Sequence, residues 1–405
     1  MVIRQEYLNK LISWKDENVI KVVTGIRRCG KSTLLQQYQS YLKDNGIADE
    51  QIISLNFEEL ENESLLDYRA LYDYIKEKLN KDKPTYIFLD EVQNVPCFEK
   101  AIDSLYVKKN TDIYITGSNS YLLSGELATL LTGRYVEISM LPLSFREFYQ
   151  LSGTDKDTSF SQYIKYGGFP YLAQMEKDDE KTNTYIEGIY NTVVIKDIEQ
   201  RQMRREQNGN LRKITDISLL KTIAKYLSSV IGNLVSVKSV TDYLVSNGRK
   251  ISANTVNDYM QALEEAYIFY PVSRFDIVGK EVLKSNKKWY VVDLGIRNHI
   301  LPRRRYDLGF SIENVVYFEL LRRGYRVNIG KFNNAEIDFI AQKNDEIIYF
   351  QVTADMTSES TFNREINPLK IINDNYEKII LTLDKFSAGN YNGIKVINLI
   401  EWLLK

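Results

Sequence analysis

The residues best suited to chemistry stand in one short stretch, GIRRCGKS, at positions 25–32. It matches the pattern GxxxxGK[ST], in which glycines let backbone N–H groups close around phosphate oxygens. The preceding VIKVVT at 19–24 is β-branched and mostly apolar, which is typical of a strand buried on both faces. The following TLLQQYQSYL has apolar residues at helical spacing, so the loop should open a helix whose N-terminus attracts anions. This context favours a phosphate-binding loop over a plain glycine turn.

Two side chains of this loop have defined chemical tasks. The ammonium of Lys31 should reach the β- and γ-phosphates of a nucleotide, and the hydroxyl of Ser32 should bind Mg²⁺. Arg27 and Arg28 could face either the nucleotide or solvent, and the sequence does not decide between these positions. The predicted nucleotide-binding residues are Gly25, Ile26, Arg27, Arg28, Cys29, Gly30, Lys31, Ser32 and Thr33.

A second buried strand, within PTYIFLDE at 84–91, ends in two adjacent carboxylates. Asp90 would bind Mg²⁺, directly or through water, and Glu91 could orient and deprotonate an attacking water molecule. Glu91 and Lys31 are therefore predicted catalytic residues. The alternative is that both acids merely end a strand with solvated charge, but the upstream glycine loop argues against it. Two neighbouring carboxylates also favour hydrolysis over nucleotide storage.

A third strand, TDIYIT at 111–116, is followed by the small polar tip GSNS. Such a tip can reach a γ-phosphate or its attacking water, which makes Ser118 and Asn119 candidates, with Asn119 as a predicted catalytic residue. These residues could equally cap the N-terminus of a following helix. The sequence leaves both interpretations open.

Composition excludes several classes of protein. The formal net charge of −1 over 405 residues gives no global positive field, so contact with nucleic acid requires local patches. One histidine leaves little room for a zinc site or an imidazole-based triad. Two cysteines, Cys29 and Cys97, suit a reducing cytoplasm. The sequence has neither a signal-peptide pattern nor an 18-residue apolar run, so we expect no membrane association.

Five segments carry a resemblance to a known family: TGIRRCGKSTLL, YIFLDEVQ, ITGSNSYLL, LTGRYVEISMLPLSFREF and YGGFP at 166–170. The sequence resembles a prokaryotic family of AAA+-like P-loop ATPases with a tail of unknown function, and the resemblance covers most of the chain. It implies a parallel sheet with helices on both faces and an extra strand between the two phosphate-binding strands. It also implies that Gln93 lies near the γ-phosphate and that Arg134 stabilises charge during hydrolysis. An exposed turn is the alternative for Arg134.

The middle of the chain changes character twice. Residues 180–213 are polar, with a basic cluster that could contact DNA phosphates or form a solvated linker face; it comprises Arg201, Arg204, Arg205, Arg212 and Lys213. From 219 to 276 three helical patterns and a strand-like FYPVSRF predict a winged helix-turn-helix. Asp258 and Glu264 lie on the outer face of its last helix, and their negative charges would repel the phosphates of a DNA backbone. Packing against protein is therefore the favoured role.

The C-terminal third has a helical segment, SIENVVYFELLRRG, followed by the strand-like pieces YRVNIG, AEIDFIAQ and EIIYFQVT. This order resembles the core of restriction-endonuclease-like domains. Those nucleases place an acid on one strand and Glu/Gln-x-Lys on the next; here Asp338 holds the first position and Gln351 the second. Thr353 stands where lysine would be expected, and a hydroxyl cannot help to activate a metal-bound water. Glu313 from a preceding helix could assist. We therefore expect a retained fold without nuclease activity.

Together these observations predict an α/β chain: an AAA+-like P-loop ATPase domain at 1–160, a helical lid or linker at 161–213, a winged helix at 214–276 and a restriction-endonuclease-like domain at 277–405. We expect Mg²⁺-dependent ATP hydrolysis coupled to movement of the C-terminal modules. An ATP-gated switch that binds DNA or protein is the alternative, and an ATP-regulated nuclease is the weaker one. The sequence leaves open whether the chain forms a ring or another oligomer.

Overall fold

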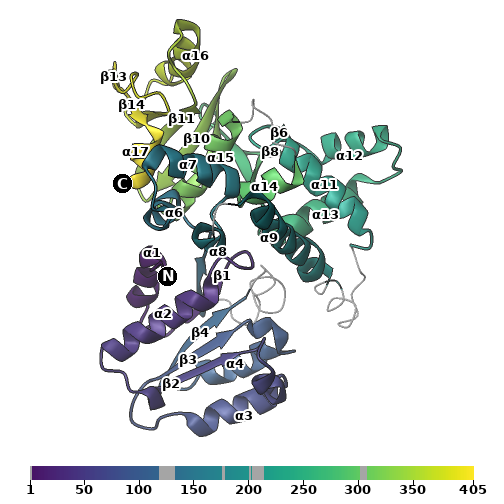
Figure 1. Ribbon diagram of the computed structural model, residues 1–405, viewed down its shortest axis with the longest axis vertical. Helices are drawn as coiled ribbons and strands as arrows, with labels where there is room; N and C mark the ends of the chain where they lie inside the picture. Colours follow the sequence, from purple (N-terminus) through teal and green to yellow (C-terminus); the bar gives the residue numbers. More distant parts are fainter. Residues whose placement is uncertain (1, 118–132, 176–177, 200–201, 203–213, 302–307) are drawn as a thin grey trace. The chain divides into compact units, whose positions relative to one another are not determined.

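The computed structural model describes residues 2–117, 133–175, 178–199, 202, 214–301 and 308–405 (Figure 1). The chain forms two compact units. The first comprises residues 1–142 with the short segment 265–267, and the second comprises residues 143–264 and 268–405. Among the described residues, no helix is long and apolar enough to cross a membrane.

The first unit is built on a five-stranded parallel sheet. Its strands are β1 (Ile20–Thr24), β2 (Ile52–Asn56), β3 (Thr85–Asp90), β4 (Thr111–Thr116) and β5 (Tyr135–Ser139), in the order β2-β3-β4-β1-β5. Every residue of β1 and β3 is buried, as expected for strands covered on both faces. The predicted extra strand is confirmed, because β4 lies between β1 and β3.

Helices cover both faces of this sheet: α1 (Gln5–Ser13), α2 (Lys31–Asp44), α3 (Tyr68–Lys78) and α4 (Phe98–Tyr106). On one face, Tyr38 of α2 packs against Phe88 and Tyr114, with ring centroids 6.1 and 5.0 Å away. On the other, α3 and α4 contribute Ile75 and Ile102 to a buried apolar cluster with the alternate strand residues. The predicted three-layer α/β architecture of a P-loop NTPase is therefore confirmed.

The second unit begins with four helices, α6 (Phe145–Ser152), α7 (Lys156–Tyr166), α8 (Pro170–Gln174) and α9 (Asp179–Asn191). The YGGFP segment joins α7 to α8. The amide of Gly168 donates a 2.6 Å hydrogen bond to the carboxylate of Asp293, and a Cβ on Gly167 would stand 2.0 Å from the same carboxylate. Both glycines are therefore required for packing, because a Cβ on Gly167 would collide with Asp293 and one on Gly168 would stand 2.5 Å from the carbonyl oxygen of Leu143.

Asp293 should make the stability of the second unit depend on pH. Burial raises the pKa of its carboxyl group to about 6, although backbone amides of Gly168 and Gly295 partly oppose the shift. The folded chain therefore binds this proton more tightly than the unfolded chain does. Its stabilising contribution is complete below pH 4 and is lost as the pH rises through 6, by roughly 2–3 kcal/mol.

Asp293→Asn should remove this dependence. We expect the urea midpoint of the parent to fall between pH 4 and 7 by more than that of the variant. Asp242→Asn, at an exposed position of the second unit, is the control and should follow the parent. Parallel curves for the parent and Asp293→Asn would contradict the assignment.

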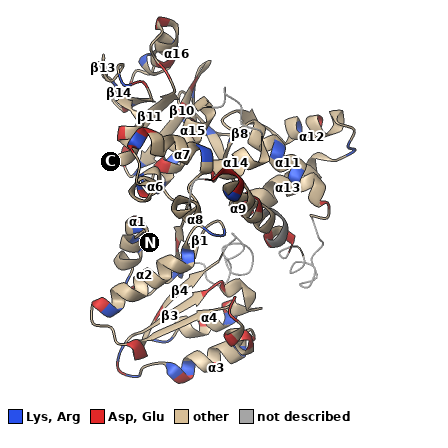
Figure 2. Cartoon of the chain, viewed as in Figure 1, with Lys and Arg blue, Asp and Glu red and all other residues tan. Residues whose placement is uncertain are grey.

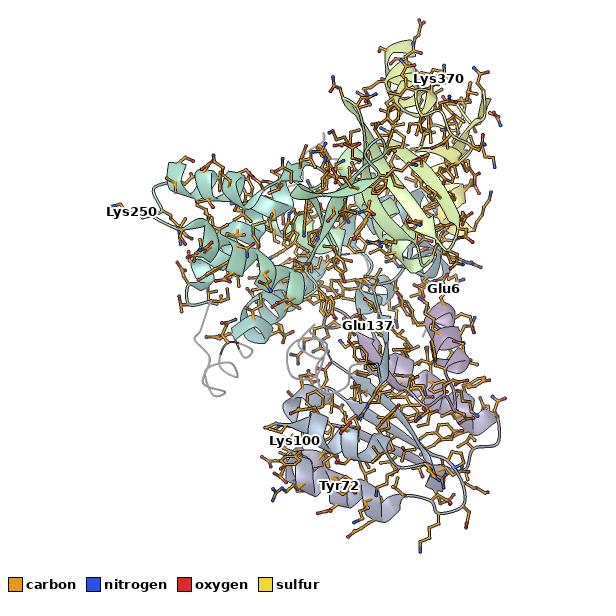
Figure 3. All side chains as sticks on the ribbon, turned by 180° about the vertical axis from the view of Figure 1, so that it is seen from behind. Glu6, Tyr72, Lys100, Glu137, Lys250 and Lys370 are labelled. Atoms are coloured by element: carbon orange, nitrogen blue, oxygen red, sulfur yellow. The ribbon has the colours of Figure 1, made fainter. Side chains whose placement is uncertain are left out.

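Next come α11 (Ile217–Ser229), β6 (Leu234–Val235), α12 (Val237–Ser246), α13 (Ala253–Glu265), β7 (Phe269–Asp276) and β8 (Glu281–Val291). The inner face of α13 is buried at Val256, Tyr259, Met260 and Leu263, whereas Tyr267 beyond its end is half-buried. Strand β8 pairs with both β6 and β7. Figure 3 labels Lys250, which precedes α13 in the turn after α12.

The remaining elements are α14 (Leu294–Ile300), α15 (Leu308–Arg322), β9 (Arg326–Phe332), β10 (Ala335–Lys343), β11 (Glu346–Thr353), α16 (Glu359–Lys370), β12 (Glu377–Thr382), β13 (Gly389–Tyr391), β14 (Ile394–Asn398) and α17 (Leu399–Leu404). One mixed sheet runs in the order β13-β14-β12-β11-β10-β9-β7-β8-β6. Because β7 pairs with β9, the ribbon predicted as a wing and the C-terminal strands share this sheet. The four-part division of the chain remains a prediction.

Charged residues of both signs are interspersed along the elements of both units (Figure 2). This distribution agrees with the formal net charge of −1. A role for charge must therefore be sought in local clusters, which are described below.

Candidate phosphate-binding and catalytic site

The glycine loop follows β1 directly and opens α2. Gly25 has φ 140° and Gly30 has φ 105°, backbone conformations that L side chains rarely adopt. A Cβ on Gly25 would also stand 2.1 Å from the carbonyl oxygen of Met140, the residue after β5. These two positions require glycine. The loop between them can therefore present its backbone N–H groups to a phosphate. The loop thus has the geometry that the sequence predicts.

Lys31 is the first residue of α2, and its side chain turns back over the loop. Its ammonium donates hydrogen bonds to the carbonyl oxygens of Gly25 at 3.1 Å and Ile26 at 3.4 Å. It also lies 3.8 Å from the carboxylate of Glu91. The side chain is 3% exposed, so this positive charge is held within the site.

Asp90 ends β3 and lies beside the start of α2. Burial raises the pKa of its carboxyl group, while hydrogen bonds from the hydroxyls of Ser32 and Thr116 oppose that shift. Thr116, at the end of β4, donates its hydroxyl hydrogen to Asp90 and accepts the backbone N–H of Glu91 at 2.9 Å. One hydroxyl therefore fixes both acids relative to each other.

Glu91 adopts a left-handed backbone conformation, with φ 52°. Such a conformation costs about 1–2 kcal/mol in a residue other than glycine. Its carboxylate accepts a hydrogen bond from the side-chain amide of Gln93, which is also buried. The structure thus brings Gln93 to the predicted catalytic acid. The acid itself is engaged by Gln93 on one side and faces Lys31 on the other.

The side chains of Ser32 and Asp90 fit a magnesium ion. Carboxylate and hydroxyl oxygens are hard ligands of the kind that Mg²⁺ prefers. The hydrogen bond between the two side chains shows that they lie side by side.

Several predicted site residues lie elsewhere. Arg134 precedes β5, and its carbonyl oxygen accepts the N–H of Ile20 at the start of β1. Because the strands are parallel, this is the sheet edge opposite to the glycine loop. Its guanidinium pairs with Asp103 and lies 5.4 Å from the ring centroid of Tyr106. The structure therefore does not bring Arg134 to the loop of its own chain.

The two loop arginines differ from each other. Arg27 is half-buried and pairs with Glu58, whereas Arg28 is exposed with a left-handed backbone at φ 69°. The candidates Ser118 and Asn119 lie outside the described residues, as do Arg201, Arg204, Arg205, Arg212 and Lys213.

Sequence reasoning missed two side chains that support the candidate site, Thr116 beside the two acids and Arg4 beside the loop. The sequence contained a signal for Thr116, because it is a polar residue at the end of a buried strand, two positions before the candidate Ser118. Arg4 carried none, because it precedes the loop by 21 positions and belongs to no motif. It is 3% exposed and donates a 3.1 Å hydrogen bond to the carbonyl oxygen of Cys29.

The second unit brings part of the predicted nuclease-like constellation together around an unforeseen lysine. The ammonium of Lys288, on β8, lies 2.9 Å from Glu313, 2.9 Å from Glu336 and 3.9 Å from Asp338. The hydroxyl of Tyr290 donates a 2.6 Å hydrogen bond to Glu313 as well. A cation from another strand therefore occupies the middle of this acidic cluster.

Burial disfavours the charged forms of both Lys288 and Asp338. It would lower the pKa of Lys288, but the carboxylates of Glu313, Asp338 and Glu336 overcome this effect and raise it. Burial also raises the pKa of Asp338, which is further increased by Glu313 and reduced by Lys288. The ammonium group of Lys288 thus offsets negative charge in this acidic cluster.

The other two predicted members contribute little to such a site. The amide oxygen of Gln351 accepts the backbone N–H of Asp338 at 3.2 Å, and the hydroxyl of Thr353 donates to the carbonyl oxygen of Asp355 at 3.1 Å. Among the described parts of the chain, no group of three or more His, Cys, Asp or Glu residues is placed to hold a metal ion. The side chains around Lys288 therefore do not fit a nuclease metal.

Lys288→Met should destabilise the second unit strongly. It would leave Glu313 and Asp338 buried without their counter-charge, at a cost of about 3–5 kcal/mol. Lys287→Met is the matched control, because this half-buried neighbour lies on the same strand. Equal urea midpoints for the two variants would show that the cluster does not depend on Lys288.

Comparison with known proteins identifies the family of this chain. An AAA domain family matches residues 17–149, and a domain of unknown function (DUF8612) matches residues 157–307. An uncharacterized protein of Haemophilus influenzae is 40% identical, with 100% of this chain and 99% of that protein aligned. Another from Methanocaldococcus jannaschii is 29% identical over 96% of this chain and 88% of its own length.

A solved structure, the Walker-type ATPase of Pyrococcus abyssi, shares the fold with a TM-score of 0.50 at 14% identity. It aligns with 74% of this chain and 96% of its own. The family match covers the unit that contains the glycine loop, Asp90 and Glu91. The chain therefore belongs to a prokaryotic family of AAA+-like P-loop ATPases.

Proposed function

We propose that this chain hydrolyses ATP to ADP and phosphate with Mg²⁺ and passes its nucleotide state to the second unit. One observation carries the proposal: the ammonium of Lys31 lies over the glycine loop, 3.8 Å from Glu91, while Asp90 lies beside Ser32. A phosphate-binding cation, a catalytic base and a metal-holding pair thus converge at one sheet edge.

Each residue has a distinct task in the proposed reaction. The backbone amides of 25–33 would hold the phosphate oxygens, and Lys31 would exchange its carbonyl contacts for the β- and γ-phosphates. Ser32 and Asp90 would hold Mg²⁺, which neutralises phosphate charge when bound. Glu91 would accept a proton from the attacking water as its oxygen bonds to the γ-phosphorus and the bond to the β-γ bridging oxygen breaks.

The remaining predicted catalytic residues have narrower proposed roles. Asn119, with Ser118, would orient the attacking water from the segment after β4. Arg134 would stabilise charge at the phosphate of a second copy, because it lies at the opposite sheet edge from its own loop. A ring or other oligomer would therefore be needed for that role.

The ATP-gated switch remains a second candidate, and one contact favours it. The carboxylate of Glu91 is engaged by Gln93 and faces Lys31, so it is not free to act as a base in this state. Basal turnover should then be slow until a partner rearranges these contacts.

We place the chain in the cytoplasm, where its two free cysteines would stay reduced.

The second unit is the proposed site for a DNA or protein partner. The order α11-β6-α12-α13-β7 supports a winged helix at 214–276, and β8, which pairs with β7, follows beyond that range. Measuring phosphate release with Mg²⁺ and with excess EDTA tests the central proposal, and adding single- or double-stranded DNA tests the partner. We expect release that requires Mg²⁺. Equal rates in EDTA would oppose metal-assisted hydrolysis.

We further propose that residues 277–405 form a restriction-endonuclease-like domain without nuclease activity. The ammonium of Lys288 amid Glu313, Glu336 and Asp338 supports this proposal. The full chain should leave supercoiled plasmid intact with Mg²⁺ or Mn²⁺, with or without ATP. Nicking that disappears in Asp338→Ala would show that the site is active.

A further inference from the structure

The phosphate loop touches the segment by which the chain leaves the first unit. This segment, Met140–Pro142, follows β5 and directly precedes Leu143, the first residue of the second unit. At the start of the loop, Gly25 is so close to the carbonyl oxygen of Met140 that a Cβ would stand 2.1 Å from it. The amide of Met140 also donates a 2.8 Å hydrogen bond to Thr24 at the end of β1.

Arg4 joins the other end of the loop to the same segment. Its guanidinium donates to the carbonyl oxygen of Cys29 at 3.1 Å, of Leu141 at 2.9 Å and of Pro142 at 3.4 Å. The side chain is 3% exposed, and a guanidinium keeps its charge at any physiological pH. Its planar fork can bond several acceptors at fixed angles, which the single nitrogen of a lysine cannot reproduce.

A neighbouring tyrosine completes the hold on this segment. The hydroxyl of Tyr7 accepts the backbone N–H of Leu141 at 3.1 Å, and the guanidinium of Arg4 lies 4.9 Å from the centroid of the Tyr7 ring. Both N–H and C=O of Leu141 are therefore bonded to side chains from the first residues of the chain. A shift of the Cys29 carbonyl would reach Leu141 and Pro142 through one rigid group.

The second unit holds the next residue just as firmly. The amide of Leu143 donates to the carbonyl oxygen of Gly168 at 2.7 Å, and the hydroxyl of Tyr163 donates to the carbonyl oxygen of Leu143 at 2.9 Å. Gly168 donates in turn to Asp293. Leu143 is thus bonded within the second unit at both its N–H and its C=O.

We propose that Arg4 is a positioning residue that transmits the state of the phosphate loop to the second unit through Leu141 and Pro142. This inference rests on the proposed function, because it assumes that ATP binds the loop. Coupling of this kind changes an equilibrium by about 5–150-fold. Its readout is therefore a nucleotide-dependent change within the second unit, which a merely structural arginine would not control.

The test is amide hydrogen exchange of the full chain, with and without a non-hydrolysable ATP analogue and Mg²⁺. In the parent, the analogue should change exchange in peptides covering 143–168 by about fivefold or more. In Arg4→Met the analogue should still slow exchange around the loop, but the change at 143–168 should be lost. Arg69→Met, at an exposed arginine of α3, is the matched control and should behave as the parent.

Two further variants separate coupling from folding. Arg4→Lys keeps the charge but not the fork, and Tyr7→Phe removes only the hydroxyl that holds Leu141, so both should reduce the change at 143–168. A full parental response in folded Arg4→Lys and Tyr7→Phe would overturn the inference while leaving ATP binding intact. Absence of analogue binding by the folded parent would instead overturn the proposed function.

Discussion

Lys31→Ala is expected to abolish ATP hydrolysis. The ammonium of Lys31 is the only charge of the loop that is buried and directed over it among the described residues, with contacts to Gly25, Ile26 and Glu91. Removing a preorganised donor of this kind lowers turnover by about 10²–10³-fold or more. The measurement is Mg²⁺-dependent phosphate release at saturating ATP.

The control for this variant is Lys43→Ala. Lys43 lies on the same helix, α2, but is exposed and pairs with Asp49. It should retain parental turnover and stability. If Lys31→Ala hydrolysed ATP as fast as Lys43→Ala, the lysine would have no part in the reaction, and the geometry of the loop would need another explanation.

Glu91→Gln should separate binding from chemistry. Glutamine preserves the size of the side chain and its place beside Gln93, but it cannot take a proton from water. Turnover should fall by about 10²–10⁴-fold, whereas affinity for a non-hydrolysable analogue should change by no more than a few fold. Single-turnover phosphate release and analogue titration together give the two quantities.

Glu63→Gln tests whether loss of any acid in the first unit has the same effect. Glu63 lies in a short helical turn that contains no buried residue. We expect parental turnover in this control. Unchanged hydrolysis in Glu91→Gln, with Glu63→Gln also unchanged, would exclude Glu91 as the base.

The candidate phosphate site could be proposed from sequence because its parts are contiguous. Gly25 to Ser32 form one motif, and the positive φ values at Gly25 and Gly30 are what its glycines predict. Asp90 and Glu91 follow an apolar strand directly, so their place at the sheet edge needed no knowledge of distant contacts. The position of β4 between β1 and β3 was predicted from the family resemblance, because no single segment of the sequence determines the order in which strands pair.

What sequence could not provide depends on contacts between distant segments. Arg4 is buried against the loop and Leu141, but nothing in MVIRQEY distinguishes it from a surface arginine. Lys288 left a faint signal: Tyr290 and Val292 follow at strand spacing, which puts the lysine on a buried face. The catalytic role of Arg134 was predicted from the family resemblance. Only the parallel register of β5 with β1 shows that Arg134 lies at the sheet edge opposite to the glycine loop.

The most direct test of the central claim is calorimetric titration of the folded parent with a non-hydrolysable ATP analogue and Mg²⁺. The convergence of the glycine loop, Lys31 and Asp90 predicts saturable binding with one site per chain, lost or greatly weakened in Lys31→Ala. A folded parent that takes up no analogue under these conditions would contradict the assignment of an ATP site to this loop.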